Sequence, residues 1–334
     1  MENQASTLIS VIVPTKDRWS FLQETMGSLA AQTYSNWEAI IVDDGSGDKT
    51  ENHVRNLGIQ DPRFKYFART TQPPGASSCR NIGFSLSRGD YVIFLDSDDL
   101  LDPDCLMNRL QEMSKQDVGF AVFMSRVFNT IPGDDDRLWN NFTDEPDLQR
   151  YLNQDIPWNT SGPIWSRKTL ETIGPWDEEC QSGQDWEFHV RAIVTGIKYR
   201  KIAQIDSSWR NTRKDSMGST WGNEENIRNR IYVMQKIEKL LKEKFLWNEN
   251  LRKRIVGTYY KYAFQLTPSL RGAMKLWRKG LESGAIKAPE YWIIAASETI
   301  HRTVNILHNQ TIKKILGSQF GRTTHLKVKS HSLG

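Results

Sequence analysis

The chain has 334 residues, of which 38% are hydrophobic and 25% charged, and its mean hydropathy is −0.58. This composition is ordinary for a soluble protein and does not support a disordered or collagen-like chain. The formal net charge of +4 is unevenly distributed: residues 1–224 hold 23 Lys and Arg against 33 Asp and Glu, whereas residues 225–334 hold 21 against 7. The length and this asymmetry predict two units with different partners, at residues 1–223 and 224–334.

Short apolar runs alternate with longer amphipathic segments over the first hundred residues. Runs typical of buried strands occupy residues 8–13, 37–42, 64–68 and 91–95. Helical spacing predicts helices over residues 20–32 (with Ser20 as the cap), 49–57 and 76–87. This β-α-β-α-β-α-β order predicts an α/β fold with a Rossmann-like, mainly parallel sheet and helices on both faces.

The rest of the chain becomes increasingly helical. Before residue 200 we expect a strand at 118–128, a polar loop at 129–146, and helices at 104–116, 167–173 and 184–194. From Glu224 onward apolar residues recur every three or four positions, and further helices are expected at 249–266, 270–283 and 289–307. The last 110 residues therefore predict a helical C-terminal region.

Polar clusters follow three of the predicted strands: Pro14-Thr15-Lys16-Asp17, Asp43-Asp44-Gly45-Ser46 and Asp96-Ser97-Asp98-Asp99. In open parallel sheets, ligands bind beyond the carboxyl ends of the strands. The carboxylates of the third cluster can face one Mn²⁺ or Mg²⁺, which prefers oxygen ligands and often combines one or two carboxylates with phosphate oxygens. A nucleotide-sugar supplies those phosphate oxygens, and the metal would stabilise the departing diphosphate.

These segments carry a resemblance to a known family. Residues 8–99 resemble the start of the family 2 glycosyltransferases, which have the A-type nucleotide-sugar-binding fold (GT-A). The matching segments occur in the family's order: Ser10 to Thr15, Val42 to Ser46, Arg80 to Gly83 and Phe94 to Asp99. The resemblance weakens toward residue 217 and does not extend over the last 110 residues.

The resemblance implies a donor site for a nucleotide-sugar, most simply a UDP-sugar. Pro14 and Thr15, with Asp17 beside them, would lie along the nucleoside. Asp43 or Asp44 would accept a hydrogen bond from the base, such as uracil N3–H; the alternative is a plain turn.

The resemblance also assigns the remaining donor-site positions. Arg80 would approach the base or the diphosphate, or else form a salt bridge to a nearby carboxylate. Asn81 would contact the donor or brace its own helix. Asp98 would be the metal ligand, and Asp96, with Ser97, would hold ribose or sugar hydroxyls.

A separate carboxylate must take the proton from the acceptor hydroxyl. Gly183-Gln184-Asp185-Trp186-Glu187 resembles the family's acidic pair at a helix start, with Gln184 in place of the first acid. Asp185 is the predicted base and Glu187 the second choice. An ordinary charge at a helix N-terminus is the alternative for Asp185.

Two departures from the family pattern affect metal binding and recognition of the nucleotide base. Ser208 to Arg213 lacks the histidine that can bind metal in the family, so Arg210 or Arg213 would supply positive charge. The segment Gln72-Pro73-Pro74-Gly75 lacks a base-reading asparagine, which leaves the choice of nucleotide open.

The sequence thus predicts an inverting glycosyltransferase acting on a glycan or lipid-linked acceptor. A phosphatase is disfavoured because its D-x-D motif follows the first strand; a non-catalytic scaffold on the same fold is the alternative. No leader and no apolar run of roughly 18–20 residues is visible, which predicts a cytoplasmic protein.

The basic C-terminal region predicts peripheral contact with an anionic membrane at its inner face. Solvated helix faces are the alternative reading of this charge. No nucleic-acid-binding motif accompanies the basic residues, so nucleic acid is not an expected partner.

Overall fold

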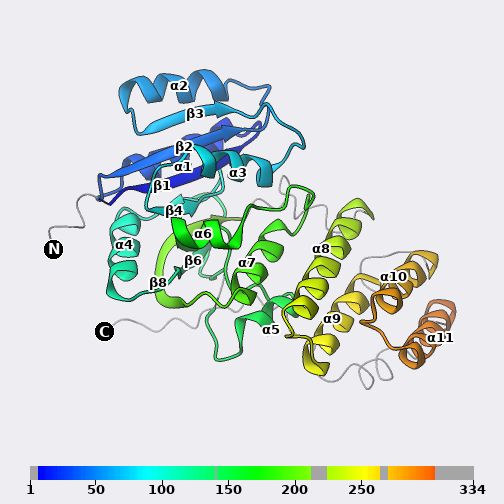
Figure 1. Ribbon diagram of the computed structural model, residues 1–334. Helices are drawn as coiled ribbons and strands as arrows, with labels where there is room; N and C mark the ends of the chain where they lie inside the picture. The colour runs from blue at the N-terminus through cyan, green and yellow to red at the C-terminus, as the bar shows by residue number, and fades with distance from the viewer. Residues whose placement is uncertain (1–6, 140, 212–223, 264–269, 305–334) are drawn as a thin grey trace.

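The computed structural model describes residues 7–139, 141–211, 224–263 and 270–304, and over these it shows one eight-stranded sheet continued by a block of helices (Figure 1). The strands are β1 (Ile9–Thr15), β2 (Trp37–Asp43), β3 (Phe64–Ala68), β4 (Tyr91–Phe94), β5 (Leu100–Leu101), β6 (Phe120–Phe128), β7 (Pro163–Ser166) and β8 (Tyr199–Arg210). The helices of the sheet region are α1 (Trp19–Ala30), α2 (Thr50–Gln60), α3 (Ala76–Leu86), α4 (Cys105–Lys115), α5 (Asp147–Leu152), α6 (Arg167–Ile173) and α7 (Gln184–Val194).

The sheet has the strand order β3-β2-β1-β4-β7-β6-β8-β5. The pairs β2–β3, β1–β2, β1–β4 and β6–β8 are parallel. β7 runs antiparallel to both β4 and β6, and β5 runs antiparallel to β8. The predicted mainly parallel sheet is confirmed, with β7 as an antiparallel insertion between two parallel groups.

Helices cover both faces of the sheet because successive residues of a strand point to opposite sides. Ile9, Val11 and Val13 of β1 pack in the cluster that contains buried residues of α1 and α4. Ile12 packs on the other face, in the cluster that contains buried residues of α3, α6 and α7. Both faces of β1 are therefore core, which explains its largely apolar sequence.

Several local expectations were wrong. α1 begins at Trp19, and its N-cap is Arg18 without a side-chain capping bond, so Ser20 lies inside the first turn. The segment at Ser208 to Arg210 belongs to β8, a strand that was not expected. β5 and α5 were also not expected, since two and six residues are too short to show a periodic pattern.

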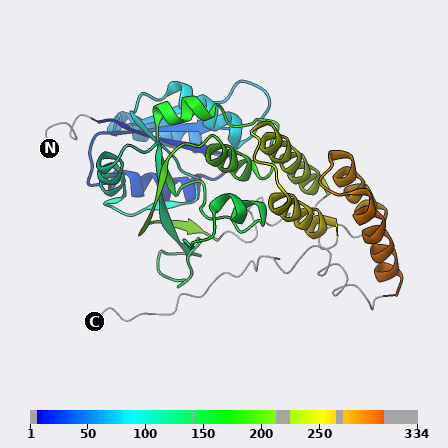
Figure 2. The ribbon, with the colours of Figure 1, turned by 60° about the horizontal axis from the view of Figure 1, so that its bottom comes forward.

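The C-terminal region consists of α8 (Glu224–Glu243), α9 (Glu249–Lys261), α10 (Leu270–Ser283) and α11 (Ala288–Val304). α8 packs on α7, α9 packs on α5, and α10 and α11 form the far end of the molecule (Figure 2). The cluster that begins with Ile12 continues through α8 and α9 to Ile294, so the sheet and the helices share a core. Over the described residues, none of the helices is long and apolar enough to span a bilayer.

Candidate active site

The loops that follow β1, β2 and β4 meet at one edge of the sheet. Thr15 and Asp43, the last residues of β1 and β2, are paired in register. The Asp17 N–H donates to Ser46 Oγ at 2.8 Å, and the Gly47 N–H donates to Asp17 Oδ1 at 2.6 Å. We call the edge of the sheet that holds the three predicted polar clusters the acidic edge. The clusters meet there because parallel strands present their carboxyl ends on one side.

Some predicted donor-site residues are buried beneath the acidic edge. Pro14, Thr15 and Ser97 are all buried. Within the described part of the chain, the Thr15 hydroxyl has no hydrogen-bond partner. Because a buried hydroxyl without a partner is costly, this group is available to a ligand that reaches the end of β1.

Asp43 and Asp44 differ in how much of each carboxylate remains available. One oxygen of Asp43 accepts hydrogen bonds from the Ser46 N–H and hydroxyl at 2.8 and 2.7 Å, and the other accepts from the Tyr66 hydroxyl at 2.8 Å. One oxygen of Asp44 is paired with the Arg69 guanidinium, and the other lies 3.9 Å from Lys16 Nζ, in a weak ion pair. Asp43 therefore braces its own turn, whereas Asp44 has an oxygen within reach of a ligand.

α3 is held against the sheet by Gly83 and carries Arg80 to the acidic edge. A Cβ on Gly83 would lie 2.3 Å from Ile12 Cγ2, so only glycine permits this approach. Arg80 Nη2 donates to Asp96 Oδ1 at 2.7 Å, and its guanidinium lies 4.5 Å from the Trp176 ring centroid. The salt bridge considered for Arg80 is present, while its buried Nε and Nη1 have no partner among the described residues.

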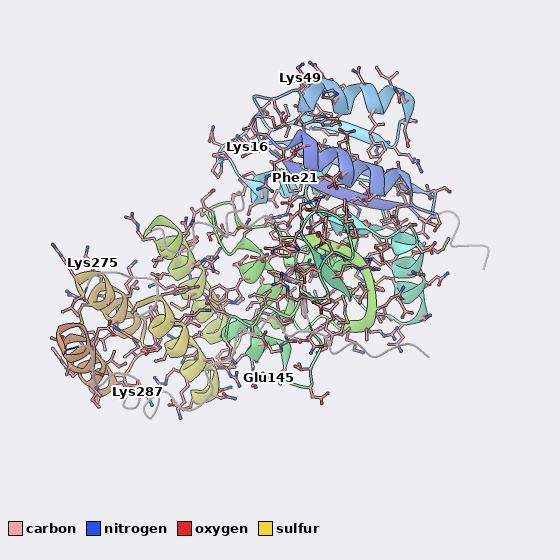
Figure 3. All side chains as sticks on the ribbon, turned by 180° about the vertical axis from the view of Figure 1, so that it is seen from behind. Lys16, Phe21, Lys49, Glu145, Lys275 and Lys287 are labelled. Atoms are coloured by element: carbon pink, nitrogen blue, oxygen red, sulfur yellow. The ribbon has the colours of Figure 1, made fainter. Side chains whose placement is uncertain are left out.

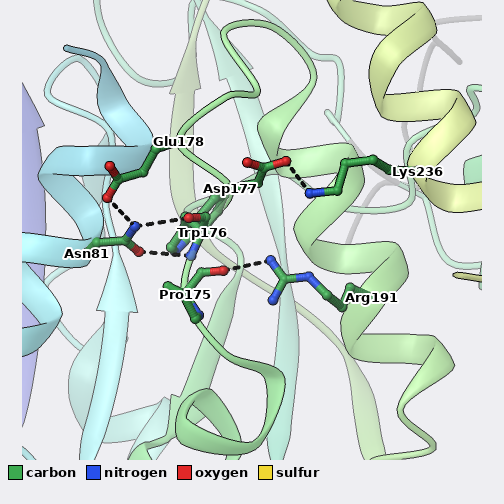
Figure 4. Close-up of a pocket in the computed structure, with 7 residues that line it drawn as sticks. All are labelled: Asn81, Pro175, Trp176, Asp177, Glu178, Arg191 and Lys236. Atoms are coloured by element: carbon green, nitrogen blue, oxygen red, sulfur yellow. Dashed lines mark hydrogen bonds and ion pairs between the residues drawn. The ribbon is translucent and has the colours of Figure 1, made fainter. Parts of the chain in front are cut away.

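Asn81 braces a loop. Its amide donates to the Trp176 carbonyl at 2.9 Å and to Glu178 Oε1 at 2.8 Å, and it accepts from the Trp176 N–H at 2.8 Å (Figure 4). Asn81 also borders an open pocket of about 530 Å³. Its lining residues are drawn in Figure 4: Asn81, Pro175, Trp176, Asp177, Glu178, Arg191 and Lys236. Its lining includes neither Asp96 nor Asp98, so we place the chemistry at the acidic edge rather than in this pocket.

Two neighbouring acids after β4 have different roles. Asp98 is partly exposed, and its Oδ2 accepts from Arg18 Nη1 at 2.6 Å. Asp99 is buried and accepts from the Ser161 hydroxyl at 2.7 Å and from the Arg210 N–H at 3.1 Å. Burial raises the pKa of both carboxyls, and the Arg18 charge opposes this for Asp98. Asp99 thus ties β4 to β8, and Asp98 is the acid available at the edge.

The acidic edge fits a hard divalent cation that takes most of its ligands from the substrate. Over the described residues, no three His, Cys, Asp or Glu side chains gather into a metal site. Asp98 is a single carboxylate already paired with a cation, so positive charge is accommodated there. Mn²⁺ and Mg²⁺ are often bound by one or two carboxylates plus phosphate oxygens. Asp98 would be the protein ligand.

Arg210 adds positive charge beside Asp98, as expected where a histidine is missing. Its Nε donates to the Asp98 carbonyl at 3.0 Å, and its Nη2 donates to Glu24 Oε2 at 2.6 Å. Arg213, the other residue considered for this role, lies outside the described residues.

Asp185 lies in the first turn of α7, next to the acidic edge. Gly183 precedes the helix with φ of 78°, a conformation that glycine adopts without strain. Burial raises the pKa of Asp185, and the charges of Arg230 and Arg80 oppose the increase, while the charge of Asp96 adds to it. This acid therefore lies within electrostatic range of both the acidic edge and α8.

Glu187 is occupied elsewhere. It is buried and ion-paired with Arg191, whose Nε lies 2.8 Å from its Oε1. Replacing such a buried pair by one unpaired charge is costly, so Glu187 serves the packing of α7. Asp185 is the better candidate for the base.

Three residues at the site were not singled out in the sequence. Arg18 directly follows the first polar cluster, so its position could have been noticed. Trp176 and Arg230 lie outside every recognised motif, and only the fold brings them to Arg80 and Asp185.

The sequence and fold were compared with known proteins. The model of Glycosyl transferase family 2 matches residues 10–174. The GalNAc(5)-diNAcBac-PP-undecaprenol beta-1,3-glucosyltransferase of Campylobacter jejuni is 26% identical over 311 residues, covering 92% of this chain and 96% of that protein. This chain covers only 18% to 42% of the length of four further curated relatives, which are 30% to 41% identical to it.

Solved structures share the fold. Residues 1–349 of TarS from S. aureus, in complex with UDP-GlcNAc, superpose with a TM-score of 0.66 at 18% identity, over 88% of this chain and 87% of that one. The mannosyltransferase PcManGT from Pyrobaculum calidifontis, in complex with GDP-Man and Mn²⁺, gives 0.51 at 17% identity, over 88% and 80%. Both confirm the GT-A fold expected from the sequence. The family itself follows from the match of the family model: this chain belongs to glycosyl transferase family 2.

Proposed function

We propose that this chain transfers a sugar from a nucleotide-sugar to a hydroxyl group of a glycan or lipid-linked acceptor. A UDP-sugar is the donor that we propose first. The observation that carries the proposal is the placement of Asp185 within electrostatic range of Arg80 and Asp96, beside the acidic edge. A donor-side metal ligand, Asp98, and an acceptor-side base, Asp185, are the two acids that a direct displacement needs.

The proposed reaction is a single inverting displacement. The acceptor oxygen bonds to the anomeric carbon as the bond from that carbon to the diphosphate oxygen breaks on the opposite face. Asp185 takes the hydroxyl proton, and the nucleoside diphosphate leaves with the bonding electrons. Mn²⁺ or Mg²⁺, when bound, would neutralise negative charge on that leaving group.

Donor recognition is assigned to the acidic edge. Asp44 has an available oxygen to accept a hydrogen bond from uracil N3–H, and Thr15 offers a buried hydroxyl. Arg80 offers two unpaired nitrogens to the diphosphate, and Asp96 would hold ribose or sugar hydroxyls. The TarS complex contains UDP-GlcNAc and the PcManGT complex GDP-Man, so guanine is the competing base.

The acceptor that we propose is a lipid-linked saccharide at the inner face of a membrane. The Campylobacter relative is named for an undecaprenol-linked acceptor. Trp292 and Ile293 of α11 are 69% and 47% exposed. Lys275 and Lys287 lie at the same end of the molecule, away from Lys16 at the acidic edge (Figure 3). Exposed apolar side chains with basic neighbours suit an anionic bilayer surface.

The membrane assignment is tested by co-sedimentation with vesicles. Wild-type protein is expected to sediment with vesicles that contain phosphatidylglycerol and to stay in solution with phosphatidylcholine alone. Replacing Trp292 and Ile293 by Ser should weaken sedimentation, whereas Ile59→Ser, at an 82% exposed site on α2, should not. Equal sedimentation with both vesicle types would count against the proposal.

The catalytic assignment is tested by titration calorimetry with UDP, GDP, CDP and dTDP, with and without Mn²⁺. One nucleotide should bind in a metal-dependent way, and Asp98→Ala should remove that metal dependence. Asp185→Asn should bind the nucleotide normally but lose sugar transfer by roughly a hundredfold or more. Absence of nucleotide binding would favour a non-catalytic scaffold.

A further inference from the structure

Trp176 lies in the loop between α6 and α7, and its backbone is held by α3. The Asn81 side chain pairs with both backbone groups of Trp176: it donates to the carbonyl at 2.9 Å and accepts from the N–H at 2.8 Å (Figure 4). Asn81 directly follows Arg80 on α3. The helix that carries Arg80 to the acidic edge therefore also fixes the residue whose ring lies against the Arg80 guanidinium.

The indole ring of Trp176 packs on two further elements. It stacks on Phe188 of α7, with ring centroids 4.0 Å apart and an angle of 3° between the ring planes. Phe94 of β4 meets it edge-on, with ring centroids 5.1 Å apart. Trp176 itself is buried. Because the ring has one stacked and one edge-on aromatic neighbour in a close-packed interior, its plane is fixed, and it offers a rigid face to Arg80.

The Arg80 guanidinium lies over this face and makes few hydrogen bonds. Its central carbon is 4.5 Å from the Trp176 ring centroid, and its Nη2 donates to Asp96 Oδ1 at 2.7 Å. Arg80 is only 3% exposed, and its Nε and Nη1 have no hydrogen-bond partner among the described residues. Burial of a cation with so few partners is costly. An aromatic face offsets part of that cost, because its negative centre attracts the cation.

We propose that Trp176 is a positioning residue, which holds the Arg80 guanidinium beside Asp96 so that Nε and Nη1 remain available to the donor diphosphate. This rests on the proposed function, in which Arg80 binds that diphosphate. The single hydrogen bond from Nη2 to Asp96 would leave the guanidinium free to turn about that bond, whereas the fixed indole face removes this freedom. Trp176 thus raises the affinity for the donor by acting through Arg80.

Titration calorimetry with UDP, GDP, CDP and dTDP in the presence of Mn²⁺ tests the proposal. Trp176→Met and Trp176→Phe introduce apolar side chains of similar size, but only Phe keeps an aromatic face. Trp176→Met should weaken binding of the preferred nucleotide about tenfold, and Trp176→Phe should restore most of the loss. Trp37→Met is the matched control, because Trp37 is also buried and its ring lies 4.0 Å from the Arg63 guanidinium, at the end of β2 opposite the acidic edge. It should lower Tm without changing nucleotide affinity.

A double-mutant cycle with Arg80→Gln distinguishes positioning from general support of the fold. If Trp176 acts through Arg80, Trp176→Met should weaken binding little further in the Arg80→Gln background, so the two losses are not additive. Phe188→Leu removes the stacked neighbour but keeps the indole, and it should show the same non-additivity even if Trp176→Met does not fold. Additive losses, or unchanged affinity in the folded variants, would overturn the proposal. A wild-type protein that binds none of the four nucleotides would overturn the proposed function, and this proposal with it.

Discussion

Three carboxylates of the acidic edge are each paired with a cation of the same chain. Asp98 is paired with Arg18 at 2.6 Å, and Asp96 with Arg80 at 2.7 Å. Asp44 is paired with the Arg69 guanidinium. Paired carboxylates avoid the repulsion that clustered negative charges would cause. In the proposed function, a donor that binds at this edge would replace some of these ion pairs with its own contacts to the same side chains.

Substituting Asp43 and Asp44 one at a time should distinguish recognition of the nucleotide base from structural support of the turn. Asp44→Asn should weaken nucleotide binding about tenfold, because it removes an ionised acceptor for the base, and it should also lower Tm, because it removes the charge that pairs with Arg69. Asp43→Asn should mainly lower Tm, because both of its oxygens hold the turn and Tyr66. Calorimetry with UDP and thermal unfolding measure the two effects. The reverse pattern would exchange the roles of Asp43 and Asp44.

Sequence alone identified which acids gather but not how each is partnered. Asp98 and Arg18 are 80 positions apart, and Arg210 and Glu24 are 186 apart. No local pattern encodes such pairs, since they depend on how the loops after separate strands are folded together. The base-reading choice between Asp43 and Asp44 was open for the same reason.

At the scale of elements, the contact between α3 and β1 positions the site. Gly83 lies against Ile12, and the same helix carries Arg80 one turn earlier. Any side chain at position 83 must push α3 away from the sheet, which would move the Arg80 guanidinium from Asp96.

Gly83→Ala should therefore destabilise the protein by about 1–3 kcal/mol and weaken nucleotide binding. Gly27→Ala on α1 is the matched control, because a Cβ there meets nothing within 4 Å. It should be neutral or stabilise by up to about 1 kcal/mol, as helical Gly→Ala changes do. Urea unfolding and calorimetry provide both readouts, and equal behaviour of the two variants would refute the close-contact argument.

Elements marked by an apolar run or by helical spacing were predictable from sequence. The strand at 64–68 and the helices at 167–173 and 270–283 were found as expected. β8 was not recognised because it has few buried apolar residues along its first half. Its place in the sheet is set by pairing with β6, which is distant in sequence.

At the scale of the whole molecule, an aromatic cluster joins the sheet to the helices. His189 is 1% exposed and stacks on Trp165, with ring centroids 6.0 Å apart. Trp158 and Trp176 also contact its ring. Neither ring nitrogen has a partner among the described residues, and burial lowers the pKa of His189 to about 3.

This histidine makes stability depend on pH. The pKa of this imidazole is about 6.5 in the unfolded chain. Below that pH the unfolded chain binds a proton there, whereas the folded chain keeps the imidazole neutral until the pH approaches 3. The stability it contributes is complete above pH 6.5 and is lost as pH falls toward 3. Between pH 6.5 and 4.5 wild type should lose about 2 kcal/mol more than His189→Phe. Urea unfolding at several pH values measures this difference, and parallel curves would contradict it.

A divalent cation that binds Asp98 would compete with the Arg18 guanidinium for this carboxylate. Metal uptake would then be an exchange of one cation for another, which is inherently weak in the absence of donor. An arriving diphosphate changes the balance, because it brings oxygens for the metal and negative charge for the released arginine. Metal and donor would consequently load together, each raising the affinity for the other.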